Sequence, residues 1–437
     1  MGRDSVTVGV LSLHTSKETK AILNAVDALG HRPVWLRRDN IGVHLTGGAV
    51  DLSPDVDVVL NRLLVSRSSH PAELLGLAEV YEGVVPVLNG PAAVLGALHK
   101  VGAATALHAA GVPVPESYLG IDPATLDAGR AHFEDRAVYK LAIGTHGDGT
   151  SLVDPDEPLI PKAVNRQAFL QRFIASSPTK PHDYRIYVVG GTVEAAMRRT
   201  AKEGEFRTNV AEGGLVEDAT SDLPQEALDI ARRATAAIGL DYAGIDVIAE
   251  DDAWYVLEVN PTAGFRGLYA ATDHSPAPAM ARLAIERAGG SVDESRVDEL
   301  ARTLDTTLPP GVAKAPPDPG ADRPTIGYTE RVSVSGTTGT ELVVAKSDTG
   351  ARRTSIDLEL AAAIGAGPIK HQTRVRSGLQ AASKARPVVD LLVGVNGDWH
   401  EVTASVEDRS HMGYEVLLGR DILRHYHVDV TREVTEE

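Results

Sequence analysis

Apolar residues along the first ninety positions follow two alternating patterns. The runs VTVGVLSL, VDVVLN and VVPVLN are typical of strands buried on both faces. Between them, KETKAILNAVDALG and AELLGLAEVY have the spacing of amphipathic helices. Strands that alternate with helices predict a parallel sheet covered by helices, and therefore an α/β domain over residues 1–90.

The next region, residues 91–303, mixes helical and strand patterns. A single helix is predicted over AAVLGALHKVGAATALHAAG, ended by Gly111 and the prolines after it. RAVYKLAIGTHGDGTSLV predicts a strand, a glycine-rich turn and a second strand. Two further helices are predicted over PQEALDIARRATAAIG and APAMARLAIERAGG.

The last part of the chain begins with a proline-rich stretch, DTTLPPGVAKAPPDPGADRPT, which predicts a stiff linker over residues 304–325. Short alternating strands follow in IGYTERVSVSG, TELVVAKSDTG and RPVVDLLVGVNGDWHEVTASVED, separated by Gly and Asn turns. This pattern predicts an all-β C-terminal domain over residues 326–437.

Within the middle region, GIDVIAEDDAWYVLEVNP predicts a β-hairpin that carries two acids inside apolar strands. A three-residue loop after Glu250 pairs Glu250 with Trp254 and places Asp246 opposite Glu258. Opposed Cβ atoms lie about 4.5–5.5 Å apart, and Asn260 projects from the same face as Glu258. Two carboxylates this close repel each other unless a cation lies between them. The alternative is a pair of solvated acids on edge strands.

Two basic features accompany this hairpin. Lys140 ends an apolar strand just before three closely spaced glycines, whose backbone N–H groups can approach phosphate oxygens. Arg198, Arg199, Lys202 and Arg207 fall within ten residues, a cluster suited to phosphate and carboxylate groups. The alternatives are an ordinary hairpin turn with a surface lysine, and a solvated loop.

Composition narrows the function classes. Among the 437 residues, 43 basic and 60 acidic side chains give a formal charge of −17, which argues against a general affinity for nucleic acid or anionic membranes. The chain has no cysteine, so disulfides, thiolate zinc sites and cysteine nucleophiles are excluded. The start MGRDSVTVGVLSLH is too polar and short for a signal peptide, and no run has the length of a membrane span. A cytoplasmic protein is expected.

Three stretches, AVYKLAIGTHGDGTSLV, DYRIYVVGGTVEAAMRRTAKEGEFRTN and AGIDVIAEDDAWYVLEVNPTAGFRG, resemble successive motifs of the RimK-type ATP-grasp ligases. The resemblance runs from about Leu88 to Asp273. It implies a pre-ATP-grasp α/β domain (1–90) and an ATP-grasp domain of two α+β subdomains (91–303). In this family ATP phosphorylates a carboxylate, and an amine, typically that of glutamate, attacks the acyl phosphate. The implied cofactors are ATP and Mg²⁺ or Mn²⁺, with two ions expected.

The resemblance also implies roles for individual residues. The ATP phosphates are expected to meet Lys100, Lys140 and the glycine turn with Gly147 and Gly149. The backbone of the hinge LQRFI, at Arg172 and Phe173, is expected to hold the adenine. Further nucleotide contacts are expected from Asp183, Arg207 and Asn209. The metal ligands correspond to Asp246, Glu258 and Asn260, an all-oxygen set that suits Mg²⁺ or Mn²⁺. Arg185 and Arg199 are the candidates for stabilising the acyl phosphate and its tetrahedral successor.

The chain departs from the family pattern after Asn260. Thr262-Ala263-Gly264 stands where Ser-Pro-Gly is common, and Arg266 follows two residues later. This loop lies near the acceptor in the family, so the acceptor is expected to differ from the best-known one. Arg266 is a candidate for binding a substrate carboxylate.

The C-terminal domain contains Asp348-Thr349-Gly350-Ala351 after an apolar strand and, some seventy residues later, LLGRD. This combination resembles retropepsin-like aspartic peptidases, and more closely the RimB-type or "ATP-dependent zinc protease" family. The resemblance implies a small β-barrel with Asp348 as the catalytic residue. Because two aspartates must share a proton, catalysis requires a homodimer. The alternatives are a simple β-turn at SDTG, or a fold that is catalytically idle and only binds peptides.

Together these features predict a two-activity enzyme. The ligase half adds glutamate or a similar amino acid to a carboxylate acceptor, either a protein C-terminus or a small cofactor. The aspartic peptidase-like half, a hydrolase, trims or recognises the product, and the chain is a homo-oligomer, at least a dimer through the C-terminal domain. Two alternatives stay open: an ATP-binding scaffold whose C-terminal domain dimerises and binds an acidic peptide, and a ligase for a small cofactor such as a pterin or a deazaflavin.

Overall fold

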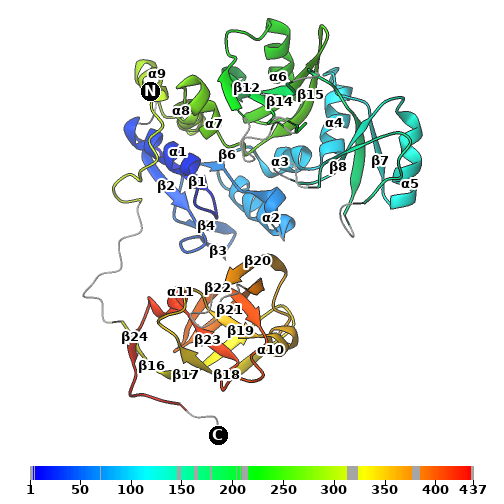
Figure 1. Cartoon of the computed structure of the whole chain (residues 1–437). Coiled ribbons are helices and arrows are strands. Elements are labelled where there is room, and N and C mark those ends of the chain that lie inside the picture. The colour runs from blue at the N-terminus through cyan, green and yellow to red at the C-terminus, as the bar shows by residue number, and fades with distance from the viewer. Residues whose placement is uncertain are drawn as a thin grey trace. The chain divides into compact units, whose positions relative to one another are not determined.

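The computed structural model describes all residues except 1–2, 4, 69, 145–148, 162–165, 178–179, 203, 207, 209–214, 313–322, 376–383 and 435–437, and, for side chains, also 371, 373–375 and 384. The chain divides into two units, Met1–Lys314 and Ala315–Glu437, here called the N-terminal and C-terminal units (Figure 1). The boundary falls inside the proline-rich stretch. Each unit has a hydrophobic core of its own.

The N-terminal unit begins with a four-stranded parallel sheet in the order β2-β1-β5-β6, as the α/β pattern predicts. Its strands are β1 (Thr7–Leu11), β2 (Arg32–Leu36), β5 (Val58–Asn61) and β6 (Val87–Leu88). The helices are α1 (Lys17–Ala28) and α2 (Pro71–Glu82), with a 3₁₀ turn η1 (Val65–Arg67) and a separate hairpin of β3 (Gly42–Thr46) and β4 (Ala49–Ser53). The helix α1 begins where the Ser16 hydroxyl accepts the N–H of Thr19, a standard cap.

The stretch predicted as one helix forms two, α3 (Pro91–Leu98) and α4 (Lys100–Ala109), so that prediction was wrong. The chain leaves helical geometry at His99 (φ −90°, ψ 104°), whose ring accepts the N–H of Gly102 and caps α4. The N–H of Lys100 donates to the carbonyl of Ala142 at 2.8 Å. The break therefore fixes Lys100 beside the end of β8, a contact that local periodicity does not encode.

Two antiparallel sheets complete the N-terminal unit. The first has the order β7-β10-β8-β9, with α5 (Pro123–Ala128) and η2 (Gly129–His132) beside it; its strands are β7 (Ser117–Gly120), β8 (Ala137–Leu141), β9 (Ser151–Val153) and β10 (Ala168–Arg172). The second has the order β13-β12-β11-β14-β15, with strands β11 (His182–Val189), β12 (Thr192–Thr200), β13 (Leu215–Asp218), β14 (Tyr242–Glu250) and β15 (Ala253–Asn260). The amphipathic helix α6 (Gln225–Ile238) buries Ala227, Ile230 and Ala234 against this sheet. The remaining helices are α7 (Arg266–Thr272), α8 (Ala277–Arg287) and α9 (Glu294–Ala301), and α8 packs against α1 (Figure 1).

The acidic hairpin of β14 and β15 has a different turn from the predicted one. Glu250 pairs with Ala253 across a two-residue turn, so the predicted Glu250–Trp254 pair was wrong. The register then shifts by one residue, because Leu257 bulges between the pairs of its two neighbours. The bulge cancels the shorter turn, and Asp246 lies opposite Glu258 as predicted.

The C-terminal unit is an all-β barrel, as its alternating pattern predicts. The strand order is β17-β18-β23-β19-β22-β21-β20, and an additional β17–β21 pairing closes the barrel. Its strands are β17 (Thr329–Ser335), β18 (Thr340–Ser347), β19 (Ser355–Asp357), β20 (Ile369–Val375), β21 (Lys384–Val395), β22 (Asp398–Glu407) and β23 (Val416–Leu418). A parallel pair, β16 (Thr325–Gly327) with β24 (His427–Asp429), and the short helices α10 (Leu358–Ala363) and α11 (Arg420–Leu423) complete it. The retropepsin-like identity of this barrel stays a prediction.

Across the described ranges of both units, no helix has the length and apolar character needed to cross a lipid bilayer.

Candidate active site

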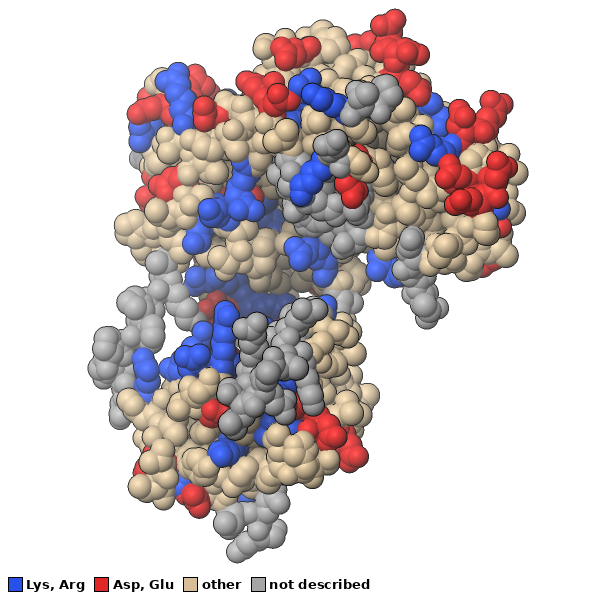
Figure 2. Space-filling model, in the orientation of Figure 1, with Lys and Arg blue, Asp and Glu red and all other residues tan. Residues whose placement is uncertain are grey.

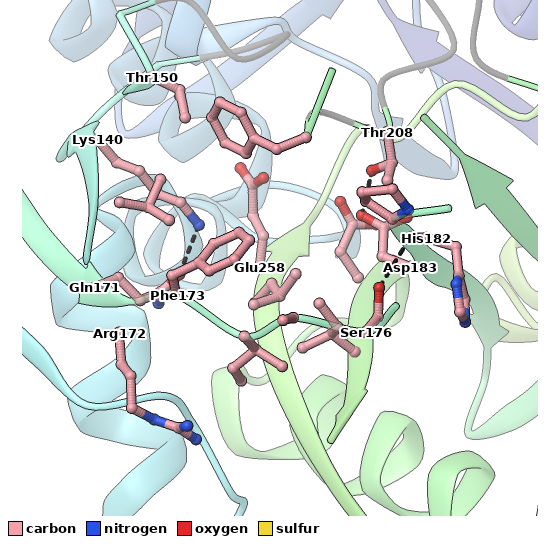
Figure 3. Close-up of a pocket in the computed structure, with 18 of the residues that line it drawn as sticks. Lys140, Thr150, Gln171, Arg172, Phe173, Ser176, His182, Asp183, Thr208 and Glu258 are labelled. Carbon is pink, nitrogen blue, oxygen red and sulfur yellow. Dashed lines mark hydrogen bonds between the residues drawn. The ribbon is translucent and has the colours of Figure 1, made fainter. Parts of the chain in front are cut away.

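A cavity of about 170 Å³ lies between the two antiparallel sheets of the N-terminal unit (Figure 3). The strands β8 and β10 supply one wall, and β11, β14 and β15 supply the other. Its lining includes Lys100, Lys140, Gln171, Phe173, Ile174, Asp183, Arg199, Thr208, Asp246, Ile248 and Glu258. Apolar side chains with a few converging charges are the usual composition of a ligand pocket.

Two lysines line this cavity together with Glu258. Lys140 Nζ donates to Gln171 Oε1 at 2.6 Å, and Figure 3 shows its amine and the Glu258 carboxylate both directed into the cavity. Lys100 Nζ lies 2.9 Å from Glu258 Oε1 and donates to the carbonyl of Gly144 at 2.7 Å. Burial lowers the pKa of Lys140 to about 8, because Glu258 offsets only part of the desolvation. The charged form of Lys140 is therefore destabilised by burial, and a bound anion would stabilise it.

The second carboxylate of the hairpin, Asp246, is held by two arginines. Arg185 binds it through Nε and Nη2 at 2.6 and 2.7 Å, and Arg199 Nη2 lies 3.1 Å from Oδ2. Arg199 also binds both oxygens of Asp183 at 2.7 Å, and the Thr208 hydroxyl donates to Asp183 at 2.6 Å. Burial alone raises the pKa of Asp246, but Arg185 and then Arg199 outweigh burial and lower it to about 2. Asp246 is therefore ionised at neutral pH.

Asn260 completes the acidic patch. It pairs with Gly244 across the hairpin, and its Nδ2 is buried without a hydrogen-bond partner in the described structure. A Cβ at position 244 would lie 2.6 Å from the Cβ of Ala263, so glycine is required for this loop to close over the strand. A buried amide group that lacks a hydrogen-bond partner, beside two carboxylates, is consistent with a site in which a bound ion and its ligands would provide the missing contacts.

The donor set fits a hard divalent cation. Within the described ranges no group of three His, Cys, Asp or Glu side chains lies close enough to hold a metal. Asp246, Glu258 and Asn260 would supply three oxygens to such an ion, and water or substrate oxygens would fill the remaining positions, the arrangement that Mg²⁺ prefers. Both carboxylates are bound to cationic side chains here, so an ion would have to displace Arg185 and Lys100 from them.

The side chains of the two hinge residues, Arg172 and Phe173, lie differently relative to the cavity. The Arg172 side chain turns away from the cavity (Figure 3), binds both oxygens of Glu250 at 2.9 and 2.8 Å, and covers the ring of Tyr255. The N–H of Arg172 donates to the carbonyl of Glu116, and that of Phe173 donates to the carbonyl of Arg136. A ligand contact through either N–H group therefore requires breaking a bond already present. The Phe173 ring lines the cavity.

Of the other residues predicted from the sequence, some lie among the described residues and some do not. Gly149 has φ +70°, in the left-handed region that glycine favours, and it precedes Thr150 of the cavity wall. Gly147, Arg207 and Asn209 lie outside the described residues. Sequence reasoning missed Gln171 and Thr208, which hold Lys140 and Asp183. Gln171 is a polar residue directly after the apolar run Ala168-Phe169-Leu170 of the hinge strand, a signal that could have found it.

A second, larger cavity of about 650 Å³ shares part of its wall with the first. Both are lined by Lys100, Gly144, Arg199, Asp246 and Glu258. The second also includes Arg185, Asn260 and residues of the α/β domain at the carboxyl ends of β1 and β5. Arg266, the predicted carboxylate ligand, lines it too, where its largely exposed side chain lies 3.5 Å from Glu18.

In the C-terminal unit the two predicted motifs contact each other. Asp348 Oδ1 accepts the N–H groups of Gly350 and Ala351 at 2.9 and 3.1 Å. The N–H of Arg420 donates to the carbonyl of Ala351 at 2.9 Å, and Asp421 accepts the hydroxyl of Thr354 at 2.8 Å. The DTGA loop and the LLGRD turn therefore form one structural cluster.

Lys140 on one antiparallel sheet and Lys100 at the start of α4 lie near the acid pair of the other sheet, an arrangement that fits the ATP-grasp ligases, which use ATP and Mg²⁺. A model of the RimK-like ATP-grasp domain matches residues 97–281. A probable alpha-L-glutamate ligase of Haemophilus influenzae (strain PittEE) is 33% identical over 225 residues, covering 50% of this chain and 73% of the relative. One of Hahella chejuensis is 29% identical over 289 residues, covering 62% and 93%. The chain belongs to the RimK-type ATP-grasp ligases, and it is an ATP-dependent ligase.

Solved structures agree with this fold. The ATP-grasp ligase PsnB complexed with a minimal precursor superposes with a TM-score of 0.50 at 20% identity, covering 64% of this chain and 98% of that one. PsnB with a phosphomimetic precursor variant, Mg and ADP gives a TM-score of 0.51 at 20% identity. The ATP-grasp part of the predicted fold class is thereby confirmed.

Proposed function

We propose that the N-terminal unit joins the amine of glutamate, or of a similar amino acid, to a carboxylate acceptor through an acyl phosphate. The observation that carries this proposal is the wall shared by the two cavities, with Lys100, Asp246 and Glu258 on it. A nucleotide in the first cavity and an acceptor in the second meet at that wall. Phosphoryl transfer needs this juxtaposition, together with positive charge where negative charge develops.

The residues divide into roles in this proposal. Asp246, Glu258 and Asn260 would hold Mg²⁺, which neutralises charge on the transferring phosphoryl group when bound. Lys100 and Lys140 would bind phosphate oxygens as cations. Arg185 and Arg199, which bind Asp246 and Asp183 in the structure, would supply positive charge near the carboxyl group being activated. No nucleophilic side chain takes part.

Glutamate as the amino donor is supported by the similarity to the probable alpha-L-glutamate ligases of H. influenzae and H. chejuensis. The acceptor stays open between a protein C-terminus and a small cofactor. PsnB is complexed with a minimal precursor, and we choose peptides as the first acceptors to try.

The direct test is an ADP-release assay with ATP, Mg²⁺, glutamate and a panel of peptide and small carboxylate acceptors. ADP release that depends on both acceptor and glutamate, and that disappears in Asp246→Ala, supports the proposal. Release that ignores the acceptor, or that survives Asp246→Ala, contradicts it. Mass spectrometry of the product identifies the amide bond and the number of residues added.

Lys140 predicts a pH dependence of nucleotide binding. Its pKa is lowered to about 8 in the free protein, and the phosphates of a bound nucleotide raise it. Binding therefore takes up a proton above pH 8, and the affinity for Mg–ADP is expected to fall about tenfold per pH unit there. Below pH 8 the lysine is already charged and the affinity is flat. Calorimetric titration between pH 7 and 9.5 measures the dissociation constant.

Lys140→Arg is the matched control, because arginine keeps its charge over this whole range. Its affinity for Mg–ADP is expected to stay flat through pH 9.5. A wild-type profile that is also flat would show that Lys140 does not meet the nucleotide.

We also propose that the C-terminal unit is an aspartic peptidase-like domain that acts as a homodimer on the ligation product. Contact between the DTGA loop and the LLGRD turn within one chain supports it, since this cluster holds Asp348 on a tight loop. A single Asp348 per chain can share a proton only with the Asp348 of another chain.

Asp348→Asn is expected to abolish cleavage of oligoglutamate products and to leave ADP release unchanged, because the substitution lies outside the ligase unit. Cleavage is followed by mass spectrometry of product length. Asp398→Asn, at the first residue of β22, is the control and should leave cleavage intact. Cleavage that survives Asp348→Asn would exclude the aspartic mechanism.

A further inference from the structure

The second cavity opens where the α/β domain faces the acidic hairpin. Its α/β side is made by the first turn of α1, around Ser16, and by the segment after β5 that begins at Arg62. Both lie at the carboxyl ends of parallel strands, the usual position of ligand sites in open α/β sheets. The opposite side is the loop after Asn260. On the face of the N-terminal unit drawn in Figure 2, acidic side chains gather toward the rim, and Lys and Arg lie nearer its middle.

Arg62 is buried in this cavity wall without an acidic partner. It is 4% exposed, its Nη1 donates to the carbonyl of Ala263 at 3.2 Å, and its Nε has no hydrogen-bond partner. The ring of Phe265 lies 6.0 Å from its guanidinium carbon. In the part of the chain that the structure describes, no carboxylate forms an ion pair with it. A buried cation without a counter-charge is costly, and such groups are commonly paired when a ligand is bound.

The other well-covered cations of the cavity have carboxylate partners already. Arg185 and Arg199 bind Asp246, and Lys100 binds Glu258. The one further acid of the wall, Glu18, lies 3.5 Å from Arg266. Among the described residues, each acidic side chain that lines the cavity therefore lies beside a cationic side chain, while Arg62 lies beside no acid in an ion pair.

The surroundings of Arg62 favour an anion. Lys17 and Arg67 are exposed on the same cavity, and the first turn of α1 adds the positive end of a helix dipole to its wall. His14, also in the wall, has its pKa lowered by burial and by Arg62, so it is uncharged at neutral pH and brings no competing charge. Arg62 Nε has no hydrogen-bond partner, and the planar guanidinium of an arginine suits a carboxylate group best.

We propose that Arg62 binds a carboxylate of the substrate that the ligation does not consume, so that the second cavity selects a molecule with at least two acidic groups. This inference rests on the proposed ligase function for the identity of the reacting group. One carboxyl or amino group lies at the wall with Asp246 and Glu258, and a second carboxylate lies at Arg62. The amino donor, as a glutamate-like diacid, and the acceptor, as an acidic peptide, are two sources of the same chemistry.

The test measures binding directly, with Mg–ADP present. L-glutamate and the peptide Glu-Glu-Glu are titrated into the full-length wild type, Arg62→Met and Arg62→Lys by calorimetry, with L-glutamine and Gln-Gln-Gln as neutral probes. Wild type is expected to bind at least one acidic probe, and Arg62→Met to bind it about 10–100-fold more weakly, the loss of a hydrogen bond to a charged group. If Arg62→Met weakens the binding of glutamate alone, Arg62 belongs to the donor site. If it weakens the binding of the peptide alone, Arg62 belongs to the acceptor site.

Controls separate this inference from the others. Arg32→Met removes an exposed arginine of the same sheet and is expected to bind both probes as wild type does. Mg–ADP affinity is expected to be unchanged in Arg62→Met. Replacing a buried unpaired arginine by methionine should hold or raise the melting temperature; if the variant fails to fold, Arg62→Lys, which keeps one charge without the planar edge, is expected to weaken binding by a smaller factor.

Equal binding of the acidic probes by wild type and both Arg62 variants overturns the inference, as does an absence of binding by wild type. The acidic probes could bind in an Arg62-dependent way although the protein releases no ADP with any acceptor. That result would support this inference and contradict the proposed function.

Discussion

Glu258→Gln is expected to lower the ligation rate by about 10²–10³-fold, the usual effect of removing one electrostatic group from a reacting centre. The amide keeps the shape of the carboxylate but loses the charge that holds Mg²⁺. The fold should be preserved, because Glu258 is partly exposed and Lys100 is its one ion-pair partner among the described residues. The kcat for ADP release, with saturating acceptor and glutamate, is the measurement. Raising the Mg²⁺ concentration is expected to restore part of the loss.

Glu226→Gln is the control for this result, since Glu226 is an exposed acid in the first turn of α6, away from both cavities. Its rate should equal that of wild type. A Glu258→Gln enzyme with wild-type kcat and an unchanged Mg²⁺ requirement would remove Glu258 from the metal site, and with it the central assignment of the hairpin.

Asp183→Asn is expected to lower the free energy of unfolding of the N-terminal unit by about 3–5 kcal/mol, the cost of breaking a buried ion pair from one side. Asp183 and Arg199 are 6% and 3% exposed, and the substitution leaves the guanidinium with Asp246 as its one remaining carboxylate partner among the described residues. Urea unfolding in a Trp399→Phe background measures the change, because the remaining tryptophans, Trp35 and Trp254, both lie in the N-terminal unit.

The exposed pair Arg198–Glu217 supplies a matched comparison on the same strands. Both side chains are about half exposed, and Glu217→Gln should leave stability unchanged within error. The double variant Asp183→Leu with Arg199→Met is expected to recover much of the lost stability, because apolar groups of similar size replace a buried pair without unpaired charge. It is not expected to recover ligation. Equal effects of Asp183→Asn and Glu217→Gln would contradict the buried-network interpretation.

Much of the architecture was predictable because it depends on local periodicity. Alternation with a period of two residues places Glu258 and Asn260 on one face of their strand. The parallel sheet of β1 and β5, the helix α6 and the strands of the barrel follow from the same kind of pattern. The resemblance to RimK-type ligases rested on these local motifs, and the similarity of residues 97–281 to that domain confirms it.

The errors arose where tertiary contacts overrode the local pattern. The apolar spacing continues through His99, yet the helix breaks there because Lys100 bonds to Ala142 on a neighbouring strand. The hairpin turn was assigned one residue too many, and the bulge at Leu257 that compensates has no signature in the sequence. A turn of two or three residues fits the same apolar runs, so only the pairing of complete strands decides between them.

The sequence by itself determined which residue types carry the chemistry and on which strand faces they lie, because side-chain direction within a strand or helix is a local property of the backbone. Only the tertiary structure decided their partners: Arg185 with Asp246, Lys100 with Glu258, and Arg62 with no acid among the residues that the structure describes. These contacts join segments separated by tens to hundreds of residues, and a single sequence carries no record of such distances. Burial, which sets both the pKa of Lys140 and the cost of leaving Arg62 unpaired, exists only once those segments have packed together.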